Sequence, residues 1–204
     1  LLAELDCMHC LKTVLSQGQS IRESGIAVEQ NFVKTHGILT AKPAVVVANM
    51  SEDDLDGNPE LDSLKAWGTT HGLPIIPVCI KFELEALELD NALRQEFLES
   101  VGIEESAISL VLRSCYEALD LLTFYTTVGK ELRAWTLKRG GTLHEAASLI
   151  HTDIQTGFIK AEIVNLNDFI THGGLNGARE AGLVLIEGRQ FCVRDMDIVH
   201  IHFR

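Results

Sequence analysis

Hydrophobic residues in the first 120 positions follow two patterns, helical spacing and short continuous runs. Residues 1–16 predict a helix, because apolar side chains recur there at intervals of three and four. These side chains are Leu1, Leu5, Met8, Leu11 and Leu15. The polar stretch 16–20 predicts a turn, and His36-Gly37 predicts the end of a second helix, since glycine commonly terminates helices. We expect the two helices to form a hairpin.

Two continuous apolar runs follow, at residues 43–49 and 73–79. Such runs are typical of strands buried on both faces of a parallel sheet. Asn58-Pro59 predicts the start of a helix between them, with a capping residue followed by proline. Further helices are predicted around residues 83–100 and 104–119. Strands alternating with helices predict an α/β fold in which helices flank a parallel sheet.

The pattern changes at about Leu122, where short alternating segments begin. Residues 132–136, 159–163 and 198–203 alternate between apolar and polar positions, as half-buried strands do. Thr142 and Glu145 have the spacing of a capping box, which predicts a helix running to about His151. The second part of the chain is therefore predicted to be a small α+β domain.

Composition excludes several classes of protein. Of the 204 residues, 46% are hydrophobic, which excludes a disordered or fibrous chain. No apolar run reaches the roughly 18 residues that a membrane helix needs, so no membrane association is expected. The acidic start at Glu4 is unlike a signal peptide, and without a Met we expect a processed or partial chain. Five cysteines at irregular spacing favour a reducing compartment, and thus the cytoplasm.

Charge is distributed unevenly along the chain. The chain has 17 basic and 29 acidic residues and a net charge of −12. Residues 1–120 contain 8 basic and 20 acidic residues, whereas residues 121–204 contain 9 of each. The step predicts a domain boundary near Asp120. The acidic first part argues against broad nucleic-acid binding, and DNA is not an expected partner, but the neutral second part can still meet RNA.

The residues that follow the two predicted strands are the best candidates for a ligand site. Asn49, Met50 and Glu52 follow the first strand, and Cys79-Ile80-Lys81 follow the second. Ligands of open α/β folds bind at this carboxyl edge of the sheet. P-loop GTPases build their base pocket from an Asn-Lys-x-Asp motif and a later tripeptide in these positions. The alternative is that Asn49 and Glu52 are merely turn and helix-cap residues.

Two substitutions in this motif change its expected specificity. In the Asn-Lys-x-Asp version the aspartate accepts two hydrogens from guanine, and adenine lacks that pair of donors. Glu52 replaces the aspartate, and its longer side chain shifts the acceptor. Met50 replaces the lysine and offers a polarisable contact to either purine ring. We therefore expect weakened specificity for guanine.

Several motifs together resemble the Obg-like ATPases of the YchF type. Besides the segments 42–52 and 76–85, the resemblance extends over Arg133 to Thr136, Ile150 to Asp153, Gly157 to Glu162, Arg179 to Gly182 and Asp195 to Phe203. It covers about residues 38–204, in order, and residues 1–37 match only as the expected helical hairpin. The resemblance implies the C-terminal portion of a cytosolic, ribosome-associated protein that binds and hydrolyses ATP in preference to GTP.

The resemblance also divides the chain into three parts. Residues 1–36 would be the second part of a helical-hairpin or coiled-coil insertion, and residues 37–120 the C-terminal half of a P-loop nucleotide-binding domain. Residues 121–204 would form a β-grasp TGS domain. By the same resemblance Asn49 and Glu52 recognise the base, with Met50 against the adenine. Cys79, Ile80 and Lys81 would fall on the later tripeptide of the base pocket.

The sequence departs from the family pattern at three points. Ile80 stands where the family commonly has Ala, so a branched side chain would crowd the base. Met196 stands where the family usually has Gly, which would be strained at a positive φ. The chain has no G-x-x-x-x-G-K-[ST] loop and no Mg²⁺-binding switch segments. We expect no ATPase activity from this chain alone, and Mg²⁺ only together with an upstream P-loop.

Other clusters have both functional and structural interpretations. Cys7 and Cys10 have the spacing of zinc ligands, but no second pair lies close in sequence, so helix packing is favoured over a metal site. His200 and His202 share one face of the last predicted strand. Those histidines and His151 are either functional groups or solvated, hydrogen-bonded residues, and the second interpretation is favoured.

The second part of the chain carries a group of basic residues that could contact ribosomal RNA. They are Lys130, Arg133, Lys138, Arg139 and Lys160. With aromatic residues nearby, such a group can meet phosphates, although it can also be an ordinary mixed-charge surface. Three functions stay open: part of an ATP- or GTP-binding hydrolase, a ribosome- or partner-binding TGS module, and a divergent or truncated relative without catalysis.

Overall fold

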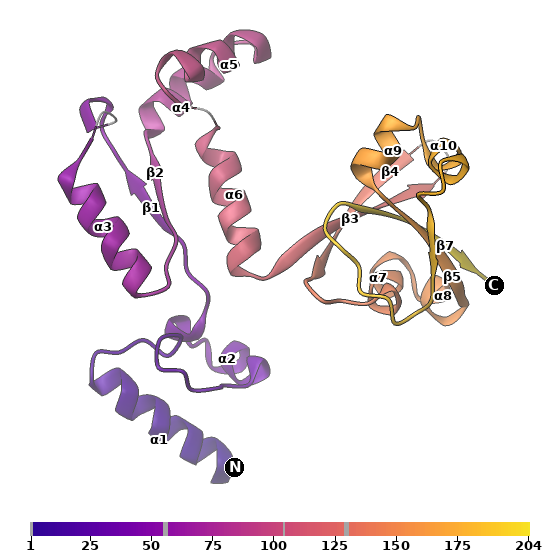
Figure 1. Ribbon diagram of the computed structural model, residues 1–204. Coiled ribbons are helices and arrows are strands. Elements are labelled where there is room, and N and C mark those ends of the chain that lie inside the picture. The colour runs from indigo at the N-terminus through magenta and orange to yellow at the C-terminus, as the bar shows by residue number, and fades with distance from the viewer. Residues whose placement is uncertain (1, 55–56, 104, 129–130) are drawn as a thin grey trace. The chain divides into compact units, whose positions relative to one another are not determined.

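The computed structural model describes residues 2–54, 57–103, 105–128 and 131–204. The chain divides into two compact units, Leu1–Ala118 and Leu119–Arg204 (Figure 1). The first unit ends two residues before Asp120, where the charge balance of the sequence changes.

The first unit begins with the helix α1 (Leu2–Ser16) and the shorter helix α2 (Gln30–His36), followed by the 3-10 turn η1 (Leu39–Ala41). α2 ends at Gly37, whose φ of 62° only glycine adopts without strain, as the sequence predicts. The hairpin is less regular than expected, because residues 21–25 form turns. There the Ser24 hydroxyl donates to the Ile21 carbonyl at 2.7 Å, which competes with helical bonding.

The apolar stripe of α1 is only partly buried. Leu11 is buried and packs with Val14 and Ile21, and Cys7 lies half-buried against this cluster. Leu5, Met8 and Leu15 are exposed. Leu1 lies outside the described residues.

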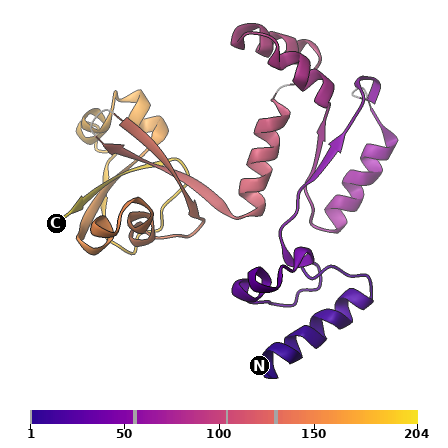
Figure 2. The ribbon, with the colours of Figure 1, turned by 180° about the vertical axis from the view of Figure 1, so that it is seen from behind.

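Two parallel strands form the sheet of the first unit, β1 (Val46–Asn49) and β2 (Ile75–Val78). The 3-10 turn η2 (Glu52–Asp54) and the helix α3 (Pro59–Thr70) connect them. α3 and α6 (Ala107–Ala118) lie on opposite sides of the strands and both contact β2 (Figures 1 and 2). The expectation that the first strand is buried on both faces is wrong. Val47 is 46% exposed, because both helices pack on β2.

The predicted helix over residues 83–100 is two helices, α4 (Ile80–Leu87) and α5 (Asn91–Ser100). Asp90 starts the second one, since its carboxylate accepts the Leu93 N–H at 3.0 Å. The Arg94 guanidinium donates to the Ala86 and Leu89 carbonyls at 2.9 and 3.2 Å. These bonds satisfy carbonyl groups at the end of α4 and stabilise the break between the helices.

The second unit is a mixed sheet of five strands with helices, as the sequence predicts. The strand order is β4-β3-β7-β5-β6, and only the pairing of β3 with β7 is parallel. The strands are β3 (Leu121–Val128), β4 (Glu131–Lys138), β5 (Phe158–Asn165), β6 (Leu185–Glu187) and β7 (Asp197–Phe203). The helices are α7 (Leu143–Ile150), α8 (Thr152–Thr156), α9 (Leu166–Thr171) and α10 (Leu175–Glu180).

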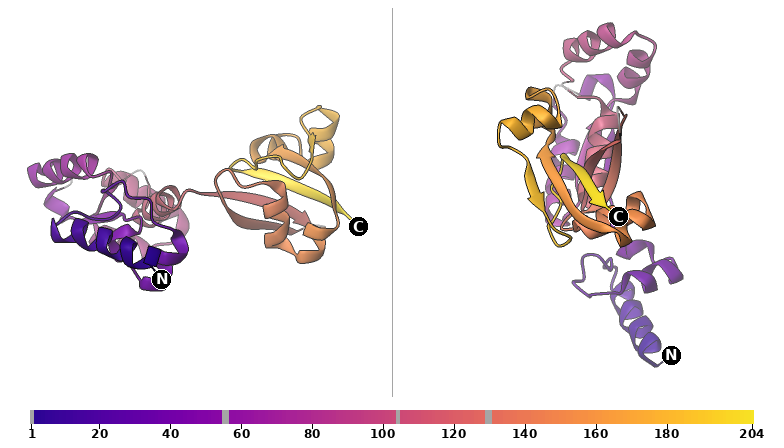
Figure 3. Two further views of the ribbon diagram at one scale, coloured as in Figure 1. Left: turned by 90° about the horizontal axis from the view of Figure 1, so that it is seen from below. Right: turned by 90° about the vertical axis from the view of Figure 1, so that its right-hand side faces the viewer.

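Helices cover both faces of this sheet (Figure 3). On one face Phe124 and Ile163 pack with Leu143 of α7 in the main core. On the other face Val164 and Ile198 pack with Ala178 of α10. Neighbouring residues such as Ile163 and Val164 point to opposite faces of a strand, so this alternation divides the core into two layers.

Candidate functional site

The two sequence segments predicted to share a ligand converge at the carboxyl edge of the first sheet. Asn49, the last residue of β1, lies opposite Val78 at the end of β2. The Met50 N–H donates to the Val78 carbonyl at 2.8 Å. The Asn49 side-chain oxygen accepts the Ile80 N–H at 3.4 Å, and this bond connects both segments directly. The segments therefore form one surface, although they are far apart in the sequence.

An ion pair forms a second connection between the segments. The Lys81 ammonium contacts the Glu52 carboxylate, and both side chains are well exposed. Hydrogen bonding and charge attraction from Glu52 raise the pKa of Lys81 above its ordinary value. Water competes for an exposed pair of this kind, so the pair itself contributes little to the stability of the fold.

The remaining residues of the predicted site differ in how much of each side chain a ligand could reach. Met50 is half-buried, whereas Cys79 is buried and precedes α4 as its N-cap residue. Cys79 could therefore meet a ligand through its backbone only. Ile80 is 46% exposed. The Ile80 N–H donates to the Asn49 side chain.

Asp54 shapes the loop that follows β1, a role that the sequence alone did not reveal. Its carboxylate accepts the Ser51 hydroxyl at 2.6 Å, the Ser51 N–H at 3.2 Å and the Asn58 amide at 3.0 Å. Hydrogen bonding from Ser51 and Asn58 outweighs desolvation and lowers the pKa of Asp54. The Ser-x-x-Asp spacing from Ser51 to Asp54 was a visible signal for this turn. Asp54 therefore serves the loop rather than facing a nucleotide.

The side chains at this edge are of types that can contact a purine base. Met50 has a polarisable thioether, and the Asn49 amide nitrogen is a hydrogen-bond donor. The Glu52 carboxylate is shared with Lys81, so it is less available to a pair of guanine donors than a free carboxylate. Adenine does not need a free carboxylate at this position, because it lacks the pair of N–H donors that guanine presents.

The predicted basic group is distributed over two faces of the second sheet. Arg133 lies opposite Thr126, on the α7 face, and pairs with Glu131 at 3.2 Å. Lys160 lies opposite His202, on the α10 face. The Lys138 ammonium donates to the Leu119 carbonyl at 2.6 Å, and Arg139 Nε lies 3.5 Å from the Asp120 carboxylate oxygen Oδ1. Lys130 lies outside the described residues.

The other candidate groups make local contacts. The Cys7 side chain packs in the core beside α1, whereas Cys10 is exposed. His151 caps α8 by accepting the Asp153 N–H at 3.1 Å. His200 and His202 contact each other edge to face, with ring centroids 4.9 Å apart. Over residues 2–54, 57–103, 105–128 and 131–204, no group of three or more His, Cys, Asp or Glu is arranged to hold a metal ion.

His202 belongs to a polar cluster that the sequence did not reveal. Glu162, buried on β5, accepts the Arg179 guanidinium at 2.6 Å and lies 3.5 Å from His202. Burial alone would raise the pKa of Glu162, but the bond to Arg179 and the nearby positive charges lower it overall. This cluster fastens α10 to the sheet.

Comparisons with known proteins identify the family. A family model described as YchF-GTPase_C, a protein of unknown function (DUF933), matches residues 121–204. The ribosome-binding ATPase YchF of Haemophilus influenzae is 40% identical over 201 residues, which are 98% of this chain and 55% of that protein. The Bacillus subtilis protein of the same name is 39% identical over 204 residues. The chain belongs to the YchF family.

A solved member of the YchF family has the same fold. The Schizosaccharomyces pombe YchF GTPase superposes with a TM-score of 0.79 at 27% identity, and the match covers 98% of this chain and 53% of that one. The chain thus spans about half the length of the relatives that it matches. Among the described residues, no helix is both long and apolar enough to cross a membrane.

Proposed function

We propose that this chain provides base recognition and a docking domain to an Obg-like NTPase that binds and hydrolyses ATP and associates with ribosomes. The observation that carries the proposal is the Asn49–Ile80 hydrogen bond, which connects the two base-recognition segments at one sheet edge. The division into half of a P-loop domain followed by a TGS domain is part of the same proposal. Membership of the YchF family supports it.

The proposed hydrolysis needs groups that the residues of this chain do not supply. Phosphoryl transfer requires a loop that cradles the phosphates and Mg²⁺ to neutralise the developing charge. This sequence has no G-x-x-x-x-G-K-[ST] motif. Catalysis therefore belongs to the intact cytoplasmic protein with Mg²⁺, and the role of Asn49, Met50, Glu52 and the 79–81 tripeptide is to select adenine over guanine.

Calorimetry on the intact protein with ATP and GTP tests this role. We expect tighter binding of ATP, because the Glu52 carboxylate is engaged by Lys81. Glu52→Asp shortens the side chain, releases it from Lys81 and presents a free carboxylate to guanine. The preference should then shift toward GTP by about tenfold, the value of one charge-assisted hydrogen bond.

Glu60→Asp is the matched control, because Glu60 is an exposed acid in the first turn of α3. This variant should keep the original preference. Equal affinity of the unmodified protein for ATP and GTP would contradict base selectivity, and the absence of any nucleotide binding would overturn the larger proposal.

The second candidate function is a binding module without catalysis, in which residues 119–204 dock on a ribosome or another partner. The printed names of the relatives include ribosome binding, and the neutral charge of this part permits contact with RNA. Cosedimentation of the chain with ribosomes at increasing salt tests it. Arg133 and Lys160 lie on opposite faces of the sheet, so Arg133→Gln and Lys160→Gln are made separately. The variant on the docking face should reduce pelleting and its salt dependence, whereas Lys34→Gln in α2 should not. Absence of cosedimentation at low salt would count against docking.

A further inference from the structure

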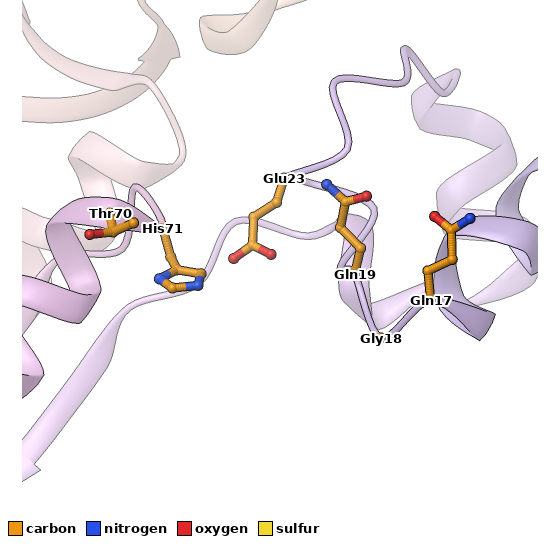
Figure 4. A pocket seen from close by; sticks show the side chains of 6 residues that line it. All are labelled: Gln17, Gly18, Gln19, Glu23, Thr70 and His71. Carbon is orange, nitrogen blue, oxygen red and sulfur yellow. The ribbon is translucent and has the colours of Figure 1, made fainter.

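A polar pocket of about 570 Å³ lies in the first unit, at the end of α1 and the end of α3. The pocket is an open hollow at the surface rather than an enclosed cavity. No lining side chain is purely hydrocarbon: the pocket is lined by Gln17, Gly18, Gln19, Glu23, Thr70 and His71. Figure 4 shows the Glu23 carboxylate and the His71 ring facing the same space, with Gln19 beside Glu23 and Gln17 beyond it. None of these residues belongs to the proposed base site.

A hydrogen bond beside the pocket makes the His71 ring an acceptor. His71 Nδ1 lies 2.8 Å from the Trp67 carbonyl, which can only accept, so Nδ1 carries the proton. The neutral ring then presents Nε2 as a lone pair. The Thr70 hydroxyl donates to the Ala66 carbonyl at 3.0 Å and is turned away from Glu23 (Figure 4).

Charge in the pocket is negative. Glu23 supplies the only carboxylate among the lining residues. The lining contains no Lys or Arg. Arg22 lines a separate hollow beside Pro43 and Leu73.

Two helix ends add to this negative potential. Residues 17–19 directly follow α1, and residues 70–71 end α3, so the C-termini of both helices lie at the pocket. A helix C-terminus carries a partial negative charge of roughly half an electron and attracts cations. Neither helix has a basic residue in its last turn to neutralise that charge.

We propose that this pocket binds a hydrogen-bond-donating organic cation, either an alkylammonium or a guanidinium group. Glu23 supplies the counter-charge, and His71 Nε2 accepts a further hydrogen. Such a cation is found both in a free polyamine and in the basic side chain of a partner protein. The proposal is independent of nucleotide binding, because the lining residues lie outside the base site.

Titration of the 204-residue chain with spermidine and with arginine amide tests the proposal. Binding is followed by NMR through the ring signals of His71. We expect saturable shifts with at least one of the two cations. Citrulline amide, the uncharged isostere of arginine amide, should leave the ring signals in place. Tighter binding of spermidine would indicate a free amine, and tighter binding of arginine amide would indicate a protein side chain.

Two variants and their controls assign the binding to the pocket. Glu23→Gln should weaken binding about tenfold, the factor that one charge-assisted hydrogen bond provides. Glu29→Gln changes an exposed carboxylate without a capping bond and should have no effect. His71→Phe, followed through backbone amide signals of residues 17–23, should also weaken binding. The matched control His36→Phe replaces a histidine that packs on Phe32 with a centroid distance of 4.4 Å.

Circular dichroism separates loss of binding from loss of folding in each variant. A folded Glu23→Gln variant that binds as tightly as the unmodified chain would overturn the proposal. Absence of saturation by both cations, or equal binding of the uncharged isostere, would overturn it as well.

Discussion

Asn49 shows how a residue expected to meet a ligand also shapes its own site. Its side-chain oxygen accepts the Ile80 N–H, so one amide group holds the ends of two strands together. The sequence indicated that these segments share a sheet edge, because the carboxyl ends of parallel strands meet there. The bond itself could not be foreseen, since it joins residues 31 positions apart. It depends on the rotamer of Asn49 and on the backbone conformation that follows β2.

Glu162 should make stability depend on pH. The pKa of Glu162 is lower in the folded state than in the unfolded chain, where it is about 4.3. The stability that ionised Glu162 contributes is therefore fully present above the unfolded-state pKa and is lost as the pH falls through the folded-state pKa. Glu162→Gln should reduce stability at pH 7 by about 1–3 kcal/mol and should flatten the acid limb. Urea unfolding between pH 3 and pH 7, roughly the range over which carboxyl groups titrate, measures both effects. Glu180→Gln, which changes an exposed acid on α10, should follow the unmodified chain.

Met196 has a φ of 66°, which confirms the strain expected of a non-glycine residue at this turn. The side chain is 39% exposed, and its removal loses one weak contact, the Tyr125 hydroxyl at 3.6 Å from the sulfur. Met196→Gly should stabilise the protein by about 0.5–1 kcal/mol. This value is the cost of the left-handed backbone conformation for methionine, minus the extra conformational entropy that glycine loses on folding. Asp120→Gly, at a φ of 53°, should gain less, because aspartate tolerates this conformation. Thermal unfolding of both variants provides the comparison, and a loss of stability for Met196→Gly would contradict this account.

At the scale of elements, helix caps and strand alternation were predicted more accurately than the burial of individual side chains. The capping box at Thr142 and the strands after residue 121 agree with the sequence, because caps and alternation are written in adjacent residues. The break between α4 and α5 was missed, although Asp90 is a good N-cap residue. The exposure of Val47 was also missed, because it depends on which helices pack on β1, and sequence periodicity does not contain that information.

The contribution of the α7 capping box to the stability of the second unit should be measurable. Glu145 N–H donates to the Thr142 hydroxyl at 3.3 Å, and the Thr142 N–H donates to the Glu145 carboxylate at 2.7 Å. α7 buries Leu143 in the main core of the second unit, so loss of its cap should affect the whole unit. Thr142→Ala should cost about 1 kcal/mol. Chemical denaturation should show no such loss for Thr152→Ala, which alters an exposed threonine at the start of α8.

At the scale of the whole molecule, the two units have cores of very different extent. In the second unit the main core surrounds Phe124 and joins several strands to α7. In the first unit fewer apolar residues are buried, and they lie in separate places: Leu11, Val14 and Ile21 beside α1, and Leu73, Ile76, Val78, Cys79, Ala86 and Leu98 elsewhere in the unit. Buried apolar surface is the main favourable term in folding, so the second unit should be the more stable. A chain with two cores also need not unfold in one step.

The two tryptophans report on the units separately, because Trp67 lies in the first and Trp135 in the second. In urea, Trp67→Phe leaves the Trp135 signal, which should change at a higher midpoint. Trp135→Phe leaves the Trp67 signal, which should change at a lower one. This second variant also removes the indole bond to Thr126 at 2.9 Å, but its loss weakens the second unit and not the unit being observed. Circular dichroism of the unmodified chain should contain both transitions. Coincident midpoints in all three measurements would show instead that the chain unfolds as one cooperative body.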